Sequence, residues 1–374
     1  MIKKIPFFDY THVFGQYKNE IQKIILDISN RGSFILQSEG LDFEKNLSDF
    51  TESKYALGVG NCTDALLMSI KAAGIGNGDE VIFSSHTFVA TASAIYHSGA
   101  TPVPVECGKD HLIDVNSIES AITSKTKAII PTQLNGHVCD MDKILEICKK
   151  YDLLLLEDSA QSLGAKFKGQ SVGTFGLSGS FSFYPAKVIG CFGDGGAVIT
   201  NNKEIFDQIF LKRDHGRAKI GEIVTWGMNS RLDNLQAAIL DFKLSKYNLD
   251  IQRRREIASI YENGLNEVKE IVLPPSPDSN KDKFEVFQNY EIEVVDSKIR
   301  KNLREYLTNK NIGTILQWGG KAVHEFEGLN FNVSLPFTEN LMRRSFLIPM
   351  NTALTNDEVL YIIENIRTYF GYEK

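Results

Sequence analysis

A lysine placed between an aromatic run and a glycine-rich turn is the residue of this chain best suited to covalent chemistry. Lys187 ends the apolar stretch 182–187 and is followed by the glycine-rich stretch 190–196. Because such a lysine has limited access to water, desolvation should lower the pKa of its ammonium. A neutral amine is a nucleophile, and its usual product is an imine with a carbonyl substrate or with pyridoxal phosphate.

An acid at the end of a leucine-rich segment is a candidate partner for such a cofactor. Residues 153–157 predict a buried strand, and Asp158 follows them. Ligands of open α/β sheets bind at the carboxyl ends of strands, where a protonated pyridine nitrogen would satisfy a buried carboxylate. Gln161 could then hydrogen-bond the ring hydroxyl. Taken alone, however, Asp158 is more simply interpreted as the cap of a following helix.

Three further segments suggest weaker contacts. The turn 58–65 joins a strand to a helix, and the free amides and dipole of such a helix suit a phosphate. Ser182 could add a hydroxyl to the same group, although a serine that faces solvent is an equal alternative. Phe88 could stack on a cofactor ring, although core packing at a helix start is the commoner role of a lone phenylalanine.

The elements that must position these residues alternate between strands and helices. Apolar runs predict strands, and segments with helical spacing predict helices between several of them. Near-continuous apolar strands indicate a mostly parallel sheet covered by helices on both faces. The predicted strands span residues 55–59, 80–83, 101–105, 127–131, 153–157, 180–184 and 197–200, and predicted helices span 63–73, 88–97 and 140–150.

The pattern changes after this α/β region. A long charged helix is expected around residues 243–255, and it divides a large domain at 1–243 from a small C-terminal domain at 244–374. The small domain is predicted to be α+β. Its expected elements are a strand at 290–295, a helix at 297–310, a strand at 314–318 and a helix at 356–370.

Composition limits the class of protein. The 374 residues are 43% hydrophobic and carry a net charge of −6, which argues against a general affinity for nucleic acid. No apolar run reaches the roughly 18 residues of a membrane span. The five cysteines and seven histidines lack metal-ligand spacing, so reduced thiols in a cytoplasm are the simplest account.

Taken together, these segments resemble the DegT/StrS family of sugar aminotransferases, which are pyridoxal-phosphate enzymes of fold type I. Several motifs in the same order are far more specific than any one of them. The matching stretches are 43–44, 58–66, 86–91, 157–161, 182–196, 213–216 and 227–238.

The resemblance implies a role for each matching residue. Lys187 would form the imine with the cofactor and move protons, Asp158 would pair with the pyridine nitrogen, and Gln161 would bind the ring hydroxyl. Phe88 would stack on the ring, and the phosphate would be held by the amides of Cys62 and Thr63 and by the hydroxyl of Ser182. Asn229 would reach the phosphate of a neighbouring subunit, which implies a homodimer. Without the resemblance, Asn229 and Arg231 are better interpreted as a capping pair before a helix at 232–240.

Some positions depart from the family pattern. Cys62 stands where members usually have glycine, which brings a thiol close to the cofactor. Gln133 and Asn135 replace a histidine and a tyrosine, so substrate contacts cannot be carried over to them. His324 lies near a histidine that the family often places by the substrate, but its context favours a surface histidine on a loop.

The resemblance predicts an aminotransferase that moves an amino group from an amino acid, L-glutamate by analogy, to a nucleotide-linked keto-sugar. A sugar dehydratase is an alternative, but such relatives commonly replace the lysine with histidine, and Lys187 argues against it. A pyridoxal-phosphate-binding regulatory protein without turnover is the third possibility.

Overall fold

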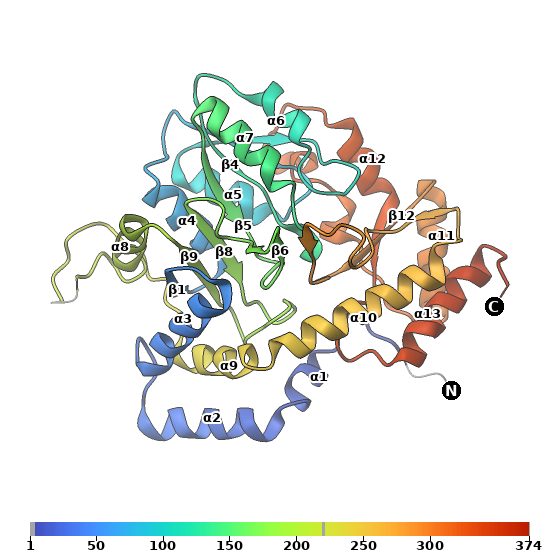
Figure 1. Cartoon of the computed structure of the whole chain (residues 1–374), viewed down its shortest axis with the longest axis horizontal. Helices are drawn as coiled ribbons and strands as arrows, with labels where there is room; N and C mark the ends of the chain where they lie inside the picture. The colour runs from blue at the N-terminus through green and yellow to red at the C-terminus, as the bar shows by residue number, and fades with distance from the viewer. Residues whose placement is uncertain (1–3, 219–220, 374) are drawn as a thin grey trace.

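A seven-stranded sheet lies at the centre of the computed structural model, which describes residues 4–218 and 221–373 (Figure 1). The spatial order is β1-β9-β8-β5-β4-β2-β3. Five neighbouring strands run parallel, and β9 is antiparallel to both β8 and β1. The strands are β1 (Tyr55–Val59), β2 (Glu80–Ser84), β3 (Thr101–Val105), β4 (Thr126–Ile130), β5 (Leu154–Asp158), β8 (Ser178–Ser182) and β9 (Gly196–Thr200).

Both faces of this sheet are buried, as the apolar strands predict. Successive side chains of a strand point to opposite faces. In β2, Ile82 belongs to one hydrophobic cluster, whereas Val81 and Phe83 belong to another. In β5, Leu155 and Leu156 divide in the same way. The expectation of an α/β sheet covered on both sides is confirmed.

Two sets of helices cover the sheet. On one side α4 (Cys62–Ala72) packs against α5 (Val89–Ser98) and α8 (Lys203–Lys212). The other side is covered by α3 (Ser38–Thr51), α6 (Val115–Ala121), α7 (Met141–Tyr151) and α9 (Asn234–Leu244). Two N-terminal helices, α1 (Tyr10–Gly15) and α2 (Lys18–Arg31), precede them.

A second hydrophobic core lies in the C-terminal part of the chain. It fills the space between a three-stranded sheet of order β10-β12-β13 and the helices packed on it. In Figure 1 this part lies beside the central sheet, and α10 runs beneath both. Its elements are α10 (Tyr247–Leu265), β10 (Ile271–Val272), β12 (Tyr290–Val294), α11 (Ser297–Asn309), α12 (Pro336–Arg344), β13 (Ser345–Ile348) and α13 (Asn356–Tyr369).

Short elements complete the chain. A small sheet of order β11-β6-β7 follows β5, and four 3-10 turns lie in loops. They are β6 (Lys166–Phe167), β7 (Gln170–Ser171), β11 (Lys283–Phe284), η1 (Leu134–Gly136), η2 (Gln317–Gly320), η3 (Val323–Glu325) and η4 (Glu327–Leu329). Within the described residues, no helix has the length and apolar character needed to cross a bilayer.

The structure corrects two of the expected elements. The strand predicted at 314–318 is wrong: Ile315 forms a single bridge to Leu347, and the chain then turns because Trp318 has φ 48°. The single helix expected at 243–255 is instead the end of α9 and the first part of α10, and residues 245–246 separate the two helices. The division at residue 243 remains a prediction.

Candidate active site

Asp158 is the last residue of β5 and lies buried at the carboxyl end of the sheet. Thr91 Oγ1 donates to its Oδ2 at 2.6 Å, and the N–H of Ala160 donates to Oδ1 at 3.2 Å. Burial raises the pKa of Asp158, and these hydrogen bonds oppose that rise. No helix begins after β5, since turns lead into β6. The helix-cap interpretation of Asp158 is therefore wrong.

Lys187 lies in the loop between β8 and β9, next to Asp158 and Cys62. Desolvation lowers the pKa of its ammonium, while the nearby Asp158 carboxylate favours the protonated form. Within the described residues, the ammonium forms no hydrogen bond and no ion pair. The structure thus brings together a lysine with a lowered pKa and a buried acid, which is typical of a site that awaits a ligand.

The turn after β1 leads directly into α4. Asn61 caps this helix by accepting a hydrogen bond from the N–H of Asp64 at 2.9 Å. Cys62 and Thr63 are the first helical residues, so their N–H groups lack intrahelical partners. Free amides at the positive end of a helix suit a phosphate. The Cys62 thiol is buried, and burial together with Asp158 raises its pKa.

Phe88 precedes α5 and is 54% exposed. The interpretation of Phe88 as a core residue is therefore wrong. The residue lies three positions before Thr91, which bonds Asp158, so the ring stands at the same end of the sheet. An exposed aromatic face in this place can receive a flat ring.

Ser182 and Gln161 frame the same end of the sheet. Ser182 ends β8 and is partly buried; its Oγ accepts a long hydrogen bond from the N–H of Tyr184, at 3.4 Å. Gln161 Oε1 accepts a hydrogen bond from the N–H of Asn135 at 2.7 Å. This bond orients the carboxamide and leaves its Nε2 donor available.

Asn229 is exposed on a loop, next to Ser230, whose Oγ accepts a hydrogen bond from the N–H of Gly60 at 3.0 Å. It pairs through the backbone with Asp214, and Arg231 Nη1 bonds Asp214 Oδ1 at 2.9 Å. The helix that follows begins at Asn234 and not at residue 232. The capping interpretation of Asn229 and Arg231 is wrong, since neither side chain caps α9.

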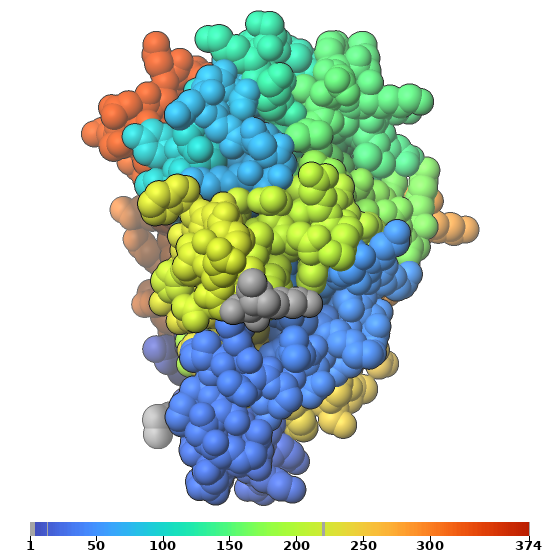
Figure 2. All heavy atoms as spheres, turned by 90° about the vertical axis from the view of Figure 1, so that its left-hand side faces the viewer, coloured from blue at the N-terminus to red at the C-terminus, as the bar shows by residue number. Residues whose placement is uncertain are grey.

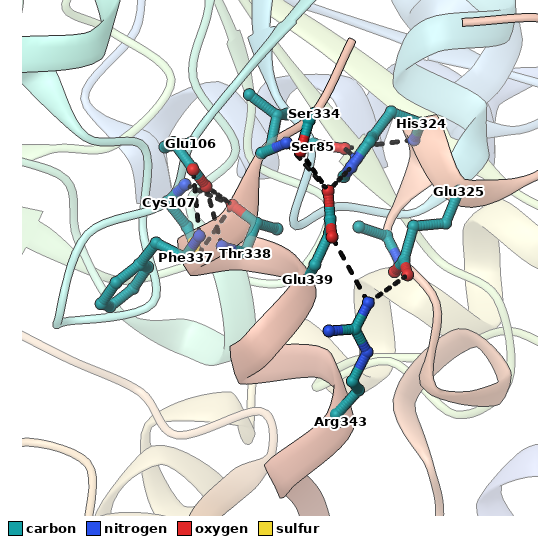
Figure 3. A network of polar contacts seen from close by, with 12 residues as sticks. Ser85, Glu106, Cys107, His324, Glu325, Ser334, Phe337, Thr338, Glu339 and Arg343 are labelled. Atoms are coloured by element: carbon teal, nitrogen blue, oxygen red, sulfur yellow. Dashed lines mark hydrogen bonds and ion pairs between the residues drawn. The ribbon is translucent and has the colours of Figure 1, made fainter. Parts of the chain in front are cut away.

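His324 is buried, and the expectation of a surface histidine is wrong. Its Nδ1 lies 2.7 Å from Ser85 Oγ, and its Nε2 lies 3.4 Å from Glu339 Oε1. Figure 3 shows Glu339 between His324 and Arg343. Both ring nitrogens thus have protein partners, and the histidine ties a C-terminal turn to the loop after β2.

Gln133 and Asn135, which depart from the family pattern, are both buried. Gln133 Nε2 donates to Glu157 Oε2 at 3.1 Å, while Asn135 Nδ2 donates to Glu291 Oε2 at 3.0 Å. Their side chains therefore serve buried polar networks of the protein.

The sequence reasoning missed the hydroxyl groups under Asp158. Thr91 and Thr132 both reach Asp158 Oδ2, and Thr87 bonds each of them. The signal available was the threonine at helical spacing after Phe88. The position of Thr132 depends on the parallel pairing of separate strands, which spacing along the chain does not reveal.

This set of groups fits pyridoxal 5'-phosphate. The unpartnered ammonium matches the aldehyde, the free amides match the phosphate, the exposed ring matches the pyridine face, and buried Asp158 matches the ring nitrogen. The fold and the site define a pyridoxal-phosphate enzyme of fold type I.

The comparison with known proteins gives the family. The sequence profile of the DegT/DnrJ/EryC1/StrS aminotransferase family matches residues 16–367. The chain belongs to this family, and it is a pyridoxal-phosphate-dependent aminotransferase.

Three relatives illustrate the similarity. The chain is 40% identical to a dTDP-3-amino-3,6-dideoxy-alpha-D-galactopyranose transaminase of Aneurinibacillus thermoaerophilus, over 98% of this chain and 100% of that one. It is 34% identical to a pleiotropic regulatory protein of Geobacillus stearothermophilus, over 98% and 99%. A crystal structure of S. venezuelae DesV superposes with a TM-score of 0.94 at 33% identity and covers 100% of both chains.

Proposed function

We propose that this protein transfers an amino group from an amino acid, L-glutamate, to a nucleotide-linked keto-sugar. The names of the sugar transaminases to which it is similar support this substrate class. The products would enter amino-sugar polymers or glycosides. The observation that carries the proposal is that Lys187, whose pKa is lowered, lies near the buried Asp158 at the carboxyl end of the sheet.

Each residue has a proposed task. When bound, pyridoxal phosphate supplies an electron sink for the carbanion that forms when an amine loses its α-proton. Lys187 Nζ would hold the cofactor and then carry a proton between donor and acceptor, for which a lowered pKa is suitable. Asp158 would keep the pyridine nitrogen protonated, since a cation lowers the cost of a buried carboxylate.

The remaining contacts would orient the cofactor. The amides of Cys62 and Thr63 and the hydroxyl of Ser182 would bind the phosphate. Phe88 would stack on the ring. Gln161 Nε2 would face the ring hydroxyl, because Asn135 already holds the carboxamide through its oxygen. His324 would contribute to the shape of the substrate side and would not hydrogen-bond the substrate, because both of its ring nitrogens have protein partners.

We also propose a homodimer in which Asn229 completes the partner's phosphate site. Its exposure on a loop supports this placement, since its side chain is accessible to a second copy. Exposed apolar side chains just before α3, in its first turn and after α8 offer a surface for the second copy. They are Phe34, Leu36, Leu41, Ile223, Val224 and Trp226. We place the protein in the cytoplasm, where its five free thiols would stay reduced.

The test is spectroscopic and chemical. The holoenzyme should absorb in the visible range, L-glutamate should abolish that band, and one member of a panel of keto-sugar nucleotides should restore it. Lys187→Ala should lose the band and lower turnover by more than about 10³-fold, because both the covalent bond and the proton carrier are removed. The matched control is Lys203→Ala, an exposed lysine on α8 paired with Asp207.

Other outcomes would favour the alternatives. A protein that binds the cofactor but shows no spectral change with any amino acid would be a regulatory protein. A product that has lost water without gaining an amino group would indicate a dehydratase. Normal turnover by Lys187→Ala would refute the proposed role of the lysine.

A further inference from the structure

The lysine lies in a loop without helix or strand, and the N–H of Lys187 donates to the C=O of Tyr184 at 2.8 Å within that loop. The two peptide groups that flank Lys187 find a side-chain partner in Gln288. The N–H of Val188 donates to Gln288 Oε1 at 2.7 Å, and Gln288 Nε2 donates to the C=O of Ala186 at 2.8 Å. One carboxamide therefore spans the lysine on both sides.

Gln288 is itself rigidly held. Its side chain is buried, and Arg254 Nη1 donates to the carbonyls of Phe287 and Gln288, both at 3.1 Å. Phe287 has a left-handed φ of 51°. A Cβ added at Gly136 would lie 2.5 Å from the amide nitrogen of Gln288, so a loop of the large sheet packs directly on this backbone. The carboxamide thus acts from a fixed base.

We propose that Gln288 is a positioning residue that fixes the backbone of Lys187 and so directs its amine toward Asp158. Gln288 touches only main-chain groups of the lysine loop and acts through Lys187. The inference rests on the role proposed above for Lys187. It connects the C-terminal part of the chain, which contributes Gln288, with the reacting group of the large sheet.

The carboxamide is chemically suited to this task because it donates and accepts at once. Gln288→Leu puts a branched apolar side chain in place of the carboxamide and removes both hydrogen bonds. Gln288→Met also removes the carboxamide, but it keeps an unbranched, uncharged side chain of similar length. The two variants therefore remove the clamp with different changes in packing.

The chain offers a matched control in the same loop. Gln236 on α9 makes the same pair of contacts with Phe192: the N–H of Phe192 donates to Oε1 at 2.8 Å, and Nε2 donates to its C=O at 3.1 Å. Gln236→Leu therefore removes a similar pair of hydrogen bonds, in a more exposed place, that does not flank Lys187. A merely structural role of Gln288 would lower the stability of the protein without changing the protonation of Lys187.

The experiment measures the protonation of Lys187 in two ways with the full chain. The first is the pH midpoint of the visible band of the holoenzyme. The second is the pH midpoint for labelling of Lys187 by trinitrobenzenesulfonate in the cofactor-free protein, located by mass spectrometry. The other titratable and charged groups that face the lysine are the same in all variants. They are Asp158 and Cys62 on the sheet side, and Asp9, His12, Tyr17, Lys243, Asp250 and Arg254 around the pocket beside residues 185–190.

In Gln288→Leu, we expect the labelling midpoint to rise by about one pH unit, because a loosened loop admits water to the ammonium. The midpoint of the visible band should move as well, and kcat should fall about tenfold or more while KM changes little. Gln236→Leu should leave both midpoints and kcat at the wild-type values.

Unchanged midpoints in Gln288→Leu, or equal shifts in both leucine variants, would overturn the proposal. If Gln288→Leu does not fold, Gln288→Met, which also adds no charge, is measured in its place against the same criteria. The labelling result does not require that the protein be a transaminase. Failure of the positioning role is therefore distinguishable from failure of the proposed function, which Lys187→Ala tests separately.

Discussion

At the scale of single residues, the buried ionisable groups of the described chain divide into those that form an ion pair and those that do not. Lys187 and Asp158 are desolvated. Burial lowers the pKa of Lys187 and raises the pKa of Asp158, so it favours the neutral form of each. Glu291 behaves in the opposite way: burial would raise its pKa, but His86 and His111 lower it to about 2. Glu291 is a structural acid that forms an ion pair with His111, whereas Lys187 and Asp158 form no ion pair within the described residues.

The ion pair between His111 and Glu291 predicts how stability depends on pH. Burial alone would lower the pKa of His111, but Glu291 and Glu293 raise it from 6.5 to about 10. Its contribution to stability is fully present below pH 6.5 and is lost as the pH rises through about 10. The contribution of Glu291 is present above pH 4.5 and is lost as the pH falls through about 2.

His111→Gln should therefore lower the free energy of unfolding at pH 6 by about 3–5 kcal/mol, because it leaves a buried carboxylate without its main cation. The difference from wild type should shrink as the pH approaches 10. Urea unfolding at several pH values measures it. A difference that stays constant from pH 6 to pH 10 would contradict a charged His111.

At the scale of elements, the middle of the sheet depends on close backbone approach. β8 carries Ser182 at its end and leads into the lysine loop. Within β8, a Cβ added at Gly179 would lie 2.2 Å from the Cα of Gly173. No side-chain movement can relieve that contact, so glycine is required where the turn before β8 crosses the strand.

Gly179→Ala should destabilise the protein by at least about 1–3 kcal/mol through overpacking. The strand should shift, so cofactor affinity should fall through Ser182 as well. Gly328→Ala is the control, since nothing lies within 4 Å of its added Cβ, and its effect should stay within about 0.5 kcal/mol. Thermal unfolding and cofactor titration measure both effects; equal stability of the two variants would show that β8 tolerates the extra methyl.

At the scale of the whole molecule, one face has the features of an interface between copies. Figure 2 shows this face, where the N-terminal residues in blue meet the yellow segment after α8. Leu36 and Leu41 line one pocket together with Phe210 and Ala218, so the two segments share a surface. Trp226 is 95% exposed. Exposed apolar groups of this size mark interaction sites.

Trp226→Glu should convert the proposed dimer to a monomer, because a buried charge without a partner opposes association. Activity and affinity for the cofactor should fall together, since Asn229 would no longer reach the partner's site. Light scattering after size exclusion measures the mass. Leu360→Glu on α13, where the leucine is 53% exposed, is the control and should leave the mass unchanged. A dimer that persists in Trp226→Glu would place the interface elsewhere.

Local pattern accounts for most of the large sheet. The predicted strands match all seven strands to within a few residues. Most of them are apolar, as expected for strands buried on both faces, whereas β8 is buried although its sequence is SGSFS. Periodicity also predicted α4, α5 and α7, whose ends are marked by Asn61, Gly99 and Asp140. The strand at 314–318 failed, since the left-handed φ of Trp318 depends on its surroundings and not on its side chain.

Residue order alone thus determined the fold class and a set of candidate residues, among them Lys187, Asp158 and Gln161. Only the tertiary structure decided which neighbours these residues have. Parallel pairing of β4 and β5 brought Thr132 to Asp158. The fold also gave both ring nitrogens of buried His324 a protein partner. A loop one hundred residues away placed the Gln288 carboxamide against the backbone on both sides of Lys187. The physical reason is that secondary structure follows local periodicity, whereas desolvation and hydrogen bonding at a site depend on segments that meet only when the chain folds.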